Sequence, residues 1–307
     1  MIGWIVYYRN ASLYNKLYID FYIEEGIKLG IDVKLVLVED LEFGVKNNRW
    51  FMKYRKEAVV APDFVICRVI YPLLSKQFEY MGIPIFNNSL ISEICNDKAR
   101  TYQHLAKTGI PIIDSSFFRN FQISNVFSDV KKPTVIKSAV GHGGSQVFLV
   151  EPSDVINYEM GSEADEDAMN FSTRKNRNDI INKLKHSDVV VQPLIGSNQR
   201  ELRVFVIGKE IIAGVLRTTK GGDKPNFSVE VDVSKYQLSE EETALVMIII
   251  DQFDFGLVGI DFVLGDNGEL IFNEIEDVVG SRRLYQCYDI NIVKLYLEFI
   301  KRKIISL

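Results

Sequence analysis

Three carboxylates lie on two segments that are predicted to form one hairpin. Asp261 lies within the predicted strand 258–264, and Glu274 and Glu276 follow the glycine turn 265–268 on the returning strand. Side chains alternate between the two faces of a strand, so Glu274 and Glu276 point the same way and the hairpin can bring Asp261 beside them.

This carboxylate group has the chemistry of a cation site. Mg²⁺ takes hard oxygen ligands and usually binds a few carboxylates together with substrate phosphates. A solvent-exposed acidic face is the alternative, but the apolar neighbours Ile260 and Phe262 disfavour it, because unpaired carboxylates are costly in such surroundings. The sequence therefore predicts a magnesium site, with Mn²⁺ as a second candidate ion.

A lysine and a glycine-rich loop between two predicted strands could bind phosphate. Lys137 ends the strand 134–137, and the loop that leads to the strand 146–150 consists of Gly141, His142, Gly143, Gly144 and Ser145. Glycines let backbone N–H groups converge on phosphate oxygens, and the lysine can supply a countercharge. A hairpin turn that only needs glycine explains the loop equally well. It is not a Walker A loop, because no Gly-Lys-Ser/Thr closes it, and the following strand excludes the dinucleotide fingerprint.

Two arginines and a strand end add weaker signals. Arg203 lies in the otherwise apolar predicted strand 201–207, and Arg217 directly follows the predicted strand 210–216. Arginine is seldom buried without a partner, and its planar fork suits phosphate or carboxylate. Salt bridges explain either arginine alone, but two of them on adjacent strands before the carboxylates favour phosphate binding. The strand that ends in Gln192, Pro193, Leu194 and Ile195 could contact an adenine, although by itself it is only a strand end.

The elements that must position these residues change character along the chain. In the first third, short β-branched or aromatic segments (5–8, 33–38, 64–67 and 85–87) alternate with helical patterns (14–29 and 72–81), which predicts a parallel sheet covered by helices. A helix follows, opened at Asn88 and ended by Gly109 and Pro111. Later segments are rich in strands, and the turns at 208–209 and 265–268 predict antiparallel hairpins.

Composition and charge restrict the class of protein. The 307 residues are 47% hydrophobic and carry a net charge of -5, so the chain can bury a sizeable core and has no basic field to attract nucleic acid. No apolar segment is long enough for a membrane span, and no signal peptide is evident. The three cysteines, far apart in the sequence, predict neither a disulfide framework nor a metal site. We therefore expect a cytoplasmic protein that acts on small substrates.

Taken in order, these motifs resemble the ATP-grasp superfamily, and within it the RimK-type branch of carboxylate-amine ligases. The resemblance covers residues from about 85 to 280. The matching segments are 96–98, 105–111, 135–138 with its loop, 191–195, 201–206, 258–261 and 273–276. It implies an α/β and α+β architecture: an N-terminal parallel-sheet domain (1–95), then a central subdomain (96–192) and a C-terminal subdomain (193–307) that clasp ATP.

The resemblance also implies residue roles. Lys98 and Lys137 would contact the nucleotide phosphates, the loop 141–145 would close over them, and the segment 192–195 would meet the adenine. Arg203 and Arg217 would hold the γ-phosphate and an acyl phosphate. Asp261, Glu274 and Glu276 would bind Mg²⁺.

One departure from the family pattern affects the substrate. The branch usually has Glu-x-Asn followed by a Ser-Pro-Gly turn, whereas this chain has Glu276 and then the segment 277–283 with Arg282 and Arg283. Glutamate can replace asparagine as an oxygen ligand, so we expect the metal site to be retained. The changed turn means that glutamate transfer is not carried over, and the two arginines become candidates for binding an anionic substrate.

The implied function is an ATP-dependent ligase that joins a small-molecule or peptide carboxylate to an amine or a thiol through an acyl phosphate. Two alternatives stay open. A kinase that phosphorylates a hydroxyl would use the same residues, and a nucleotide-binding protein without turnover would be expected to lack one of the charged groups. A homodimer is the default expectation for such an enzyme.

Overall fold

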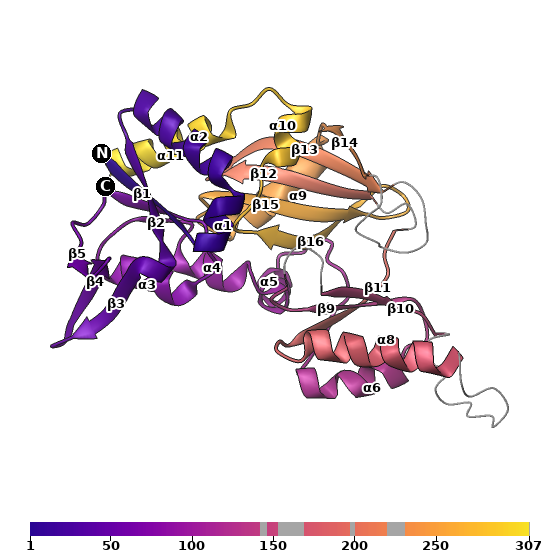
Figure 1. The fold of residues 1–307 in the computed structure, drawn as a ribbon. Coiled ribbons are helices and arrows are strands. Elements are labelled where there is room, and N and C mark those ends of the chain that lie inside the picture. The colour runs from indigo at the N-terminus through magenta and orange to yellow at the C-terminus, as the bar shows by residue number, and fades with distance from the viewer. Residues whose placement is uncertain (142–145, 153–168, 197–199, 220–230, 307) are drawn as a thin grey trace.

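The computed structural model describes residues 1–141, 146–152, 169–196, 200–219 and 231–306. Their strands form four sheets. Figure 1 shows the N-terminal sheet with a small sheet that projects from it, the sheet formed by segments of residues 200–276 beside them, and the sheet formed by segments of residues 116–193 below. The loop residues His142, Gly143, Gly144 and Ser145 lie outside the described residues.

The N-terminal sheet has the order β2-β1-β6-β7, and all of its strand pairs are parallel, as predicted. Its strands are β1 (Ile2–Tyr7), β2 (Asp32–Leu37), β6 (Phe64–Cys67) and β7 (Ile85–Phe86), and its helices are α1 (Arg9–Tyr14), α2 (Lys16–Lys28) and α3 (Pro72–Tyr80). The helix predicted over 14–29 is α2, and the short helix α1 before it was not predicted. Asn15 separates the two helices and donates its N–H to Ala11 O at 3.0 Å, which closes α1.

A small antiparallel sheet between β2 and β6 was not predicted. It consists of β3 (Leu41–Lys46), β4 (Arg49–Tyr54) and β5 (Glu57–Ala58), after a short 3₁₀ turn, Val38–Asp40. Asn47 and Asn48 form the β3–β4 turn with φ of 52° and 57°. Positive φ at both central residues is typical of a two-residue hairpin turn, so the Asn-Asn pair was the signal that could have revealed it.

The single helix predicted from Asn88 to Gly109 is two helices, α4 (Ser89–Ile94) and α5 (Lys98–Leu105). Asp97 interrupts it, because its carboxylate accepts a hydrogen bond from Arg100 N at 3.1 Å and so caps a new helix. This break has a consequence for the site, since it makes Lys98 the first residue of α5.

A four-stranded sheet with the order β10-β9-β11-β8 follows, and its strand pairs are antiparallel. The strands are β8 (Ser116–Phe118), β9 (Thr134–Ser138), β10 (Val147–Val150) and β11 (Val189–Pro193). The helices α6 (Ile123–Ser128) and α8 (Met169–Leu184) cover one side of this sheet in Figure 1, and they contribute Ile123, Phe127 and Leu184 to its apolar core. A 3₁₀ turn over Asn120–Gln122 precedes α6.

The last sheet is antiparallel with the order β14-β13-β12-β15-β16. Its strands are β12 (Arg200–Ile207), β13 (Glu210–Thr219), β14 (Val231–Tyr236), β15 (Leu257–Leu264) and β16 (Leu270–Glu276), and the helices that accompany it are α9 (Glu240–Asp251), α10 (Arg282–Cys287) and α11 (Ile292–Ile305). The hairpins predicted at 208–209 and 265–268 are confirmed.

One apolar core joins the two ends of the chain. Ile5 and Phe64 of the N-terminal sheet and Tyr22 of α2 share this core with Phe205 of β12 and Leu297 of α11. Figure 1 shows α11 beside the N-terminal sheet, although the two are far apart in the sequence. Among the helices that the structure describes, none is long and apolar enough to cross a membrane.

Candidate active site

The three predicted carboxylates meet on the paired strands β15 and β16. The register places Asp261 opposite Glu274 and Gly259 opposite Glu276, with a bulge between Asp261 and Phe262. One carboxylate oxygen from each of Asp261, Glu274 and Glu276 lies within 4.8 Å of the others. This carboxylate cluster therefore has the donor atoms and the spacing to hold a divalent cation.

Arg203 holds two members of the carboxylate cluster from the neighbouring strand β12. Its Nε and Nη2 donate to the two oxygens of Asp261 at 2.7 and 2.6 Å, and its Nη1 lies 2.9 Å from Glu276 Oε2. Burial raises the pKa of Glu276, and the nearby Asp261 and Glu274 add to this effect while Arg203 opposes it. A cation that binds here must share these oxygens with Arg203.

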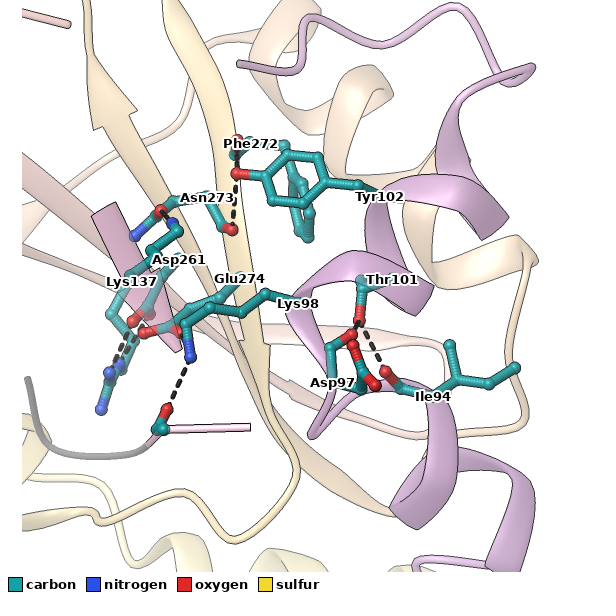
Figure 2. A network of polar contacts seen from close by, with 12 residues as sticks. Ile94, Asp97, Lys98, Thr101, Tyr102, Lys137, Asp261, Phe272, Asn273 and Glu274 are labelled. Atoms are coloured by element: carbon teal, nitrogen blue, oxygen red, sulfur yellow. Dashed lines mark hydrogen bonds and ion pairs between the residues drawn. The ribbon is translucent and has the colours of Figure 1, made fainter. Parts of the chain in front are cut away.

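Lys98 pairs with the third carboxylate. Its Nζ lies 2.9 Å from Glu274 Oε2 and donates to Gly141 O at 2.6 Å, at the start of the predicted phosphate loop. Burial favours the neutral form of Glu274, but the charges of Lys98 and Lys137 outweigh it and lower the pKa of this carboxyl group. Lys98 therefore joins the loop to the carboxylate cluster, as Figure 2 shows.

Lys137 approaches the same strand from β9. Its Nζ donates to Asn273 Oδ1 at 3.0 Å and lies 5.8 Å from the ring centroid of Tyr102, whose hydroxyl donates to Asn273 O at 2.9 Å. Figure 2 shows Lys98, Lys137, Asp261 and Glu274 gathered beside β16. Burial, with a contribution from Lys98, lowers the pKa of Lys137 to about 8, although the charge of Glu274 opposes the shift.

If Lys137 contacts the nucleotide phosphates, as the resemblance implies, its lowered pKa predicts that nucleotide affinity depends on pH. Above pH 8 the ammonium is lost from the free protein, so ATP affinity should fall between pH 7 and pH 9, by about tenfold if one hydrogen bond to a charged group is at stake. Calorimetric titration of the protein with ATP at several pH values measures this. Lys137→Arg keeps its charge over the whole range and should give a much flatter profile; an equally steep profile would contradict the assignment.

Arg217 lies near the cluster but pairs with a different acid. Its Nη1 is 3.1 Å from Glu201 Oε2, and the two residues face each other across β12 and β13. Burial raises the pKa of Glu201, with Arg217 opposing the shift. The buried Nε of Arg217 has no hydrogen-bond partner among the described residues, so this atom is available to an incoming anion.

The predicted adenine segment lies at the end of β11 in the central sheet. Gln192 is buried, and its amide Nε2 donates to Ser115 Oγ at 2.7 Å. Leu194 N donates to Pro133 O at 3.1 Å, and the Leu194 side chain is half exposed, while Pro193 and Ile195 are partly buried. The Gln192 amide is thus already engaged within the protein.

A cavity of about 870 Å³ lies next to Arg203. Its walls come from α1 and α2 on one side and from the segment 280–291 on the other, which includes the candidate substrate residues Arg282 and Arg283. Arg282 stacks on Tyr14, with its guanidinium carbon 4.4 Å from the ring centroid. The structure therefore brings the predicted cations Arg203, Arg282 and Arg283 to one cavity.

Several residues of this site were missed by the sequence prediction. Tyr102 was not predicted, although it lies four residues after Lys98 and therefore on the same face of α5. Asn273 belongs to the motif around Glu274, but no role was predicted for it. Glu201 was likewise missed, because nothing in the sequence shows which acid pairs with Arg217.

Comparison with known proteins identifies the family to which this chain belongs. Residues 95–300 match the RimK-like ATP-grasp domain, about two thirds of the chain. The protein is thus a member of the ATP-grasp ligases, a class that uses ATP and Mg²⁺. Within that class it belongs to the RimK-like ATP-grasp family, which confirms the family and the fold inferred from the motifs.

Individual relatives support the same placement. An uncharacterized protein of Mycoplasma genitalium, MG011, is 27% identical over 289 residues, which cover 91% of this chain and 87% of the relative. A probable alpha-L-glutamate ligase of Vibrio vulnificus is 24% identical over 96% of this chain and 93% of its own. The ATP-grasp ligase PsnB, solved with a phosphomimetic variant of its minimal precursor, Mg and ADP, has a TM-score of 0.66 at 16% identity over 97% of both chains.

Proposed function

We propose that this protein is an ATP-dependent ligase that activates a carboxylate as an acyl phosphate and transfers the acyl group to an amine, or alternatively to a thiol, with release of ADP and phosphate. The observation that carries the proposal is the meeting of the carboxylate cluster with Lys98, Lys137 and Arg203 beside one strand. The probable glutamate ligase among its relatives is named for the same reaction class.

The carboxylate cluster is the proposed Mg²⁺ site. Its three acidic groups supply the hard oxygen donors that Mg²⁺ prefers, and they lie close enough together to share one ion, or Mn²⁺ in its place. When bound, the ion neutralises charge on the phosphates of ATP during phosphoryl transfer. Arg203 fixes the orientation of two of the three carboxylates before any ligand arrives.

The remaining cations have proposed roles in the transfer. Lys98 and Lys137 bind phosphate oxygens of ATP, the loop 141–145 covers them, the segment 192–195 contacts the adenine, and Arg203 and Arg217 stabilise charge on the γ-phosphoryl group. A carboxylate oxygen of the substrate attacks the γ-phosphorus, and the bond to the β,γ-bridging oxygen breaks to release ADP. The amine then attacks the acyl carbon, phosphate leaves, and the amine proton passes to phosphate or solvent.

The charge balance of the cluster predicts that metal binding depends on nucleotide. Asp261 and Glu276 are already paired with Arg203, and Glu274 is paired with Lys98. A bare ion must compete with these cations, whereas the phosphates of a nucleotide can attract them and free the carboxylates. We expect Mn²⁺ to bind at least about tenfold more tightly with ADP than without it, as measured by paramagnetic resonance of the free ion.

Arg203→Gln gives a matched test of this coupling. The variant should bind Mn²⁺ more tightly than the wild-type protein when no nucleotide is present, because two carboxylates lose their partner. Equal affinities for the bare ion in both proteins would show that Arg203 does not compete with the metal.

The products of turnover test the ligase reaction. The protein is incubated with Mg-ATP and pooled carboxylic acids and amines, with Glu274→Gln as the inactive control. ADP and phosphate that appear only when an acid and an amine are both present establish the reaction. ADP without free phosphate would identify a kinase, AMP with pyrophosphate would exclude an acyl phosphate, and ATP binding without turnover by any pool would favour a binding protein.

Proposals on organisation, location and assembly accompany this function. We propose that the chain is organised as an N-terminal domain (residues 1–95), a central subdomain (residues 96–192) and a C-terminal subdomain (residues 193–307). We also propose that the enzyme works in the cytoplasm on a small-molecule or peptide substrate, and that it forms a homodimer. Light scattering of the purified protein tests the last point.

A further inference from the structure

The cavity beside Arg203 combines positive charge with an aromatic wall. Its aromatic lining residues are Tyr14, Tyr18, Phe21, Tyr285 and Tyr288. Its volume of about 870 Å³ lies in the upper half of the range of about 300–1,000 Å³ that ligand pockets occupy. A small polar amino acid would leave most of this space unfilled, so the size favours a larger ligand.

The arginines of this cavity differ in what they already bind. Arg68 donates to Val279 O at 2.9 Å and to Tyr7 OH at 3.3 Å, and Arg203 holds the carboxylate cluster. Arg282 donates to the Tyr14 hydroxyl and stacks on its ring. Arg283 differs from them, because its buried Nη1 has no hydrogen-bond partner among the described residues.

The surroundings of Arg283 favour the binding of an anion. Burial lowers the pKa of Arg283, and so do the like charges of Arg217 and Arg203 nearby. A carboxylate placed between these cations would satisfy the free Nη1 and relieve their repulsion. It would also lie beside Arg203, which both lines the cavity and contacts the proposed metal ligands. The bound carboxylate would therefore be next to the site of phosphoryl transfer.

The side of the cavity formed by α1 and α2 is largely apolar. It includes Tyr14 and Leu17, which are 71% and 86% exposed. Phe21 lies on the same side and packs edge to face against Tyr285 of the segment 280–291, with ring centroids 6.2 Å apart. An apolar group that covers these side chains would be stabilised by the area it removes from water.

We propose that this cavity binds the acid substrate of the ligase, and that this substrate is a carboxylic acid with an aromatic or similarly bulky apolar body. Arg283 holds the carboxylate that becomes phosphorylated, and the wall from Tyr14 to Phe21 holds the body. The inference rests on the ligase function proposed above. The same chemistry is offered by a free aromatic acid and by a peptide that ends in an aromatic residue.

Binding measurements with the full chain test this assignment. Calorimetric titration in the presence of Mg-ADP compares 3-phenylpropanoate, acetate, glutamate and a short peptide that ends in phenylalanine. We expect 3-phenylpropanoate or the peptide to bind at least about tenfold more tightly than acetate and glutamate, and the tighter of the two identifies the source of the acid. Glutamate binding equal to or tighter than both would overturn the proposal.

Variants test separately the carboxylate-binding end of the cavity and its apolar end. Arg283→Met should weaken all four acids by about tenfold, Arg283→Lys should restore some of the loss, and the exposed Arg302→Met on α11 should bind like the wild type. Phe21→Ala should weaken only the two aromatic ligands. Unchanged binding in Arg283→Met would refute the role of that residue. ADP affinity, measured alongside, reports folding, and absence of ADP binding by the wild type would instead refute the ligase function itself.

Discussion

Replacing Glu274 by glutamine should lower the rate of ADP formation by about 10²–10³-fold, the usual effect of removing one preorganised charged group from a transfer site. The variant keeps the shape of the side chain but removes its charge. It thereby removes one proposed metal ligand and the ion pair to Lys98 at 2.9 Å. Coupled measurement of ADP release under saturating Mg-ATP, with an active substrate pair, gives the rate.

A control separates this effect from a general loss of charge. Glu240→Gln changes an exposed glutamate in the first turn of α9, away from the site, and should keep the wild-type rate. Both proteins should have the same far-ultraviolet circular dichroism, since Glu274→Gln is isosteric. A Glu274→Gln enzyme that retains more than about a tenth of the activity would contradict the assignment of Glu274 as a metal ligand.

Replacing Asp277 by alanine should lower the free energy of unfolding by about 3 kcal/mol, because each buried polar group left unsatisfied costs about 1–3 kcal/mol. The Asp277 carboxylate is 4% exposed and accepts hydrogen bonds from Asn87 Nδ2 at 2.6 Å and from Asn96 Nδ2 at 3.0 Å. It thus connects the end of β16 both to the N-terminal sheet and to the start of α5. Urea unfolding followed by circular dichroism measures the change.

Asp254→Ala is the matched control for this variant. Asp254 has a side chain that is 75% exposed and lies 3.6 Å from Lys303, so its loss should change the free energy by no more than about 0.5 kcal/mol. Each asparagine amide also donates to a backbone carbonyl, Asn87 Nδ2 to Leu257 O at 3.0 Å and Asn96 Nδ2 to Ser92 O at 2.8 Å. Equal unfolding free energies for Asp277→Ala and the wild type would mean that these carbonyls are sufficient acceptors. The network would then not hold β16 in place.

The fold was predictable where the sequence has a strong local pattern. Alternation and glycine turns placed the hairpins around Gly208 and Gly268 correctly, and with them the opposition of Asp261 and Glu274. The sequence pattern did not predict the elements whose boundaries are set by a single polar residue. Asp97 caps a second helix inside what looked like one helix, and the turn at Asn47 closes a hairpin whose first strand has no fully buried residue.

The sequence predicted which residues form the site better than it predicted which of them contact one another. Arg203 was expected to face phosphate, yet it makes a two-pronged contact with Asp261, a residue 58 positions away. Sequence shows that both charges are present, but only the three-dimensional arrangement of β12 and β15 shows that they meet. The same holds for Lys137, since its contact with Asn273 depends on how two different sheets are placed side by side.

The core that joins the two ends of the chain affects how the protein is made. Ile5, Tyr22 and Phe64 are synthesised at least 233 residues before Leu297 (297 − 64), which packs into the same core. At about 5–20 residues per second, the interval between them is on the order of ten seconds or more. During that interval α2 covers this core only in part, and the apolar side chains that later contact α11 stay exposed, which makes the nascent chain a natural client for a chaperone.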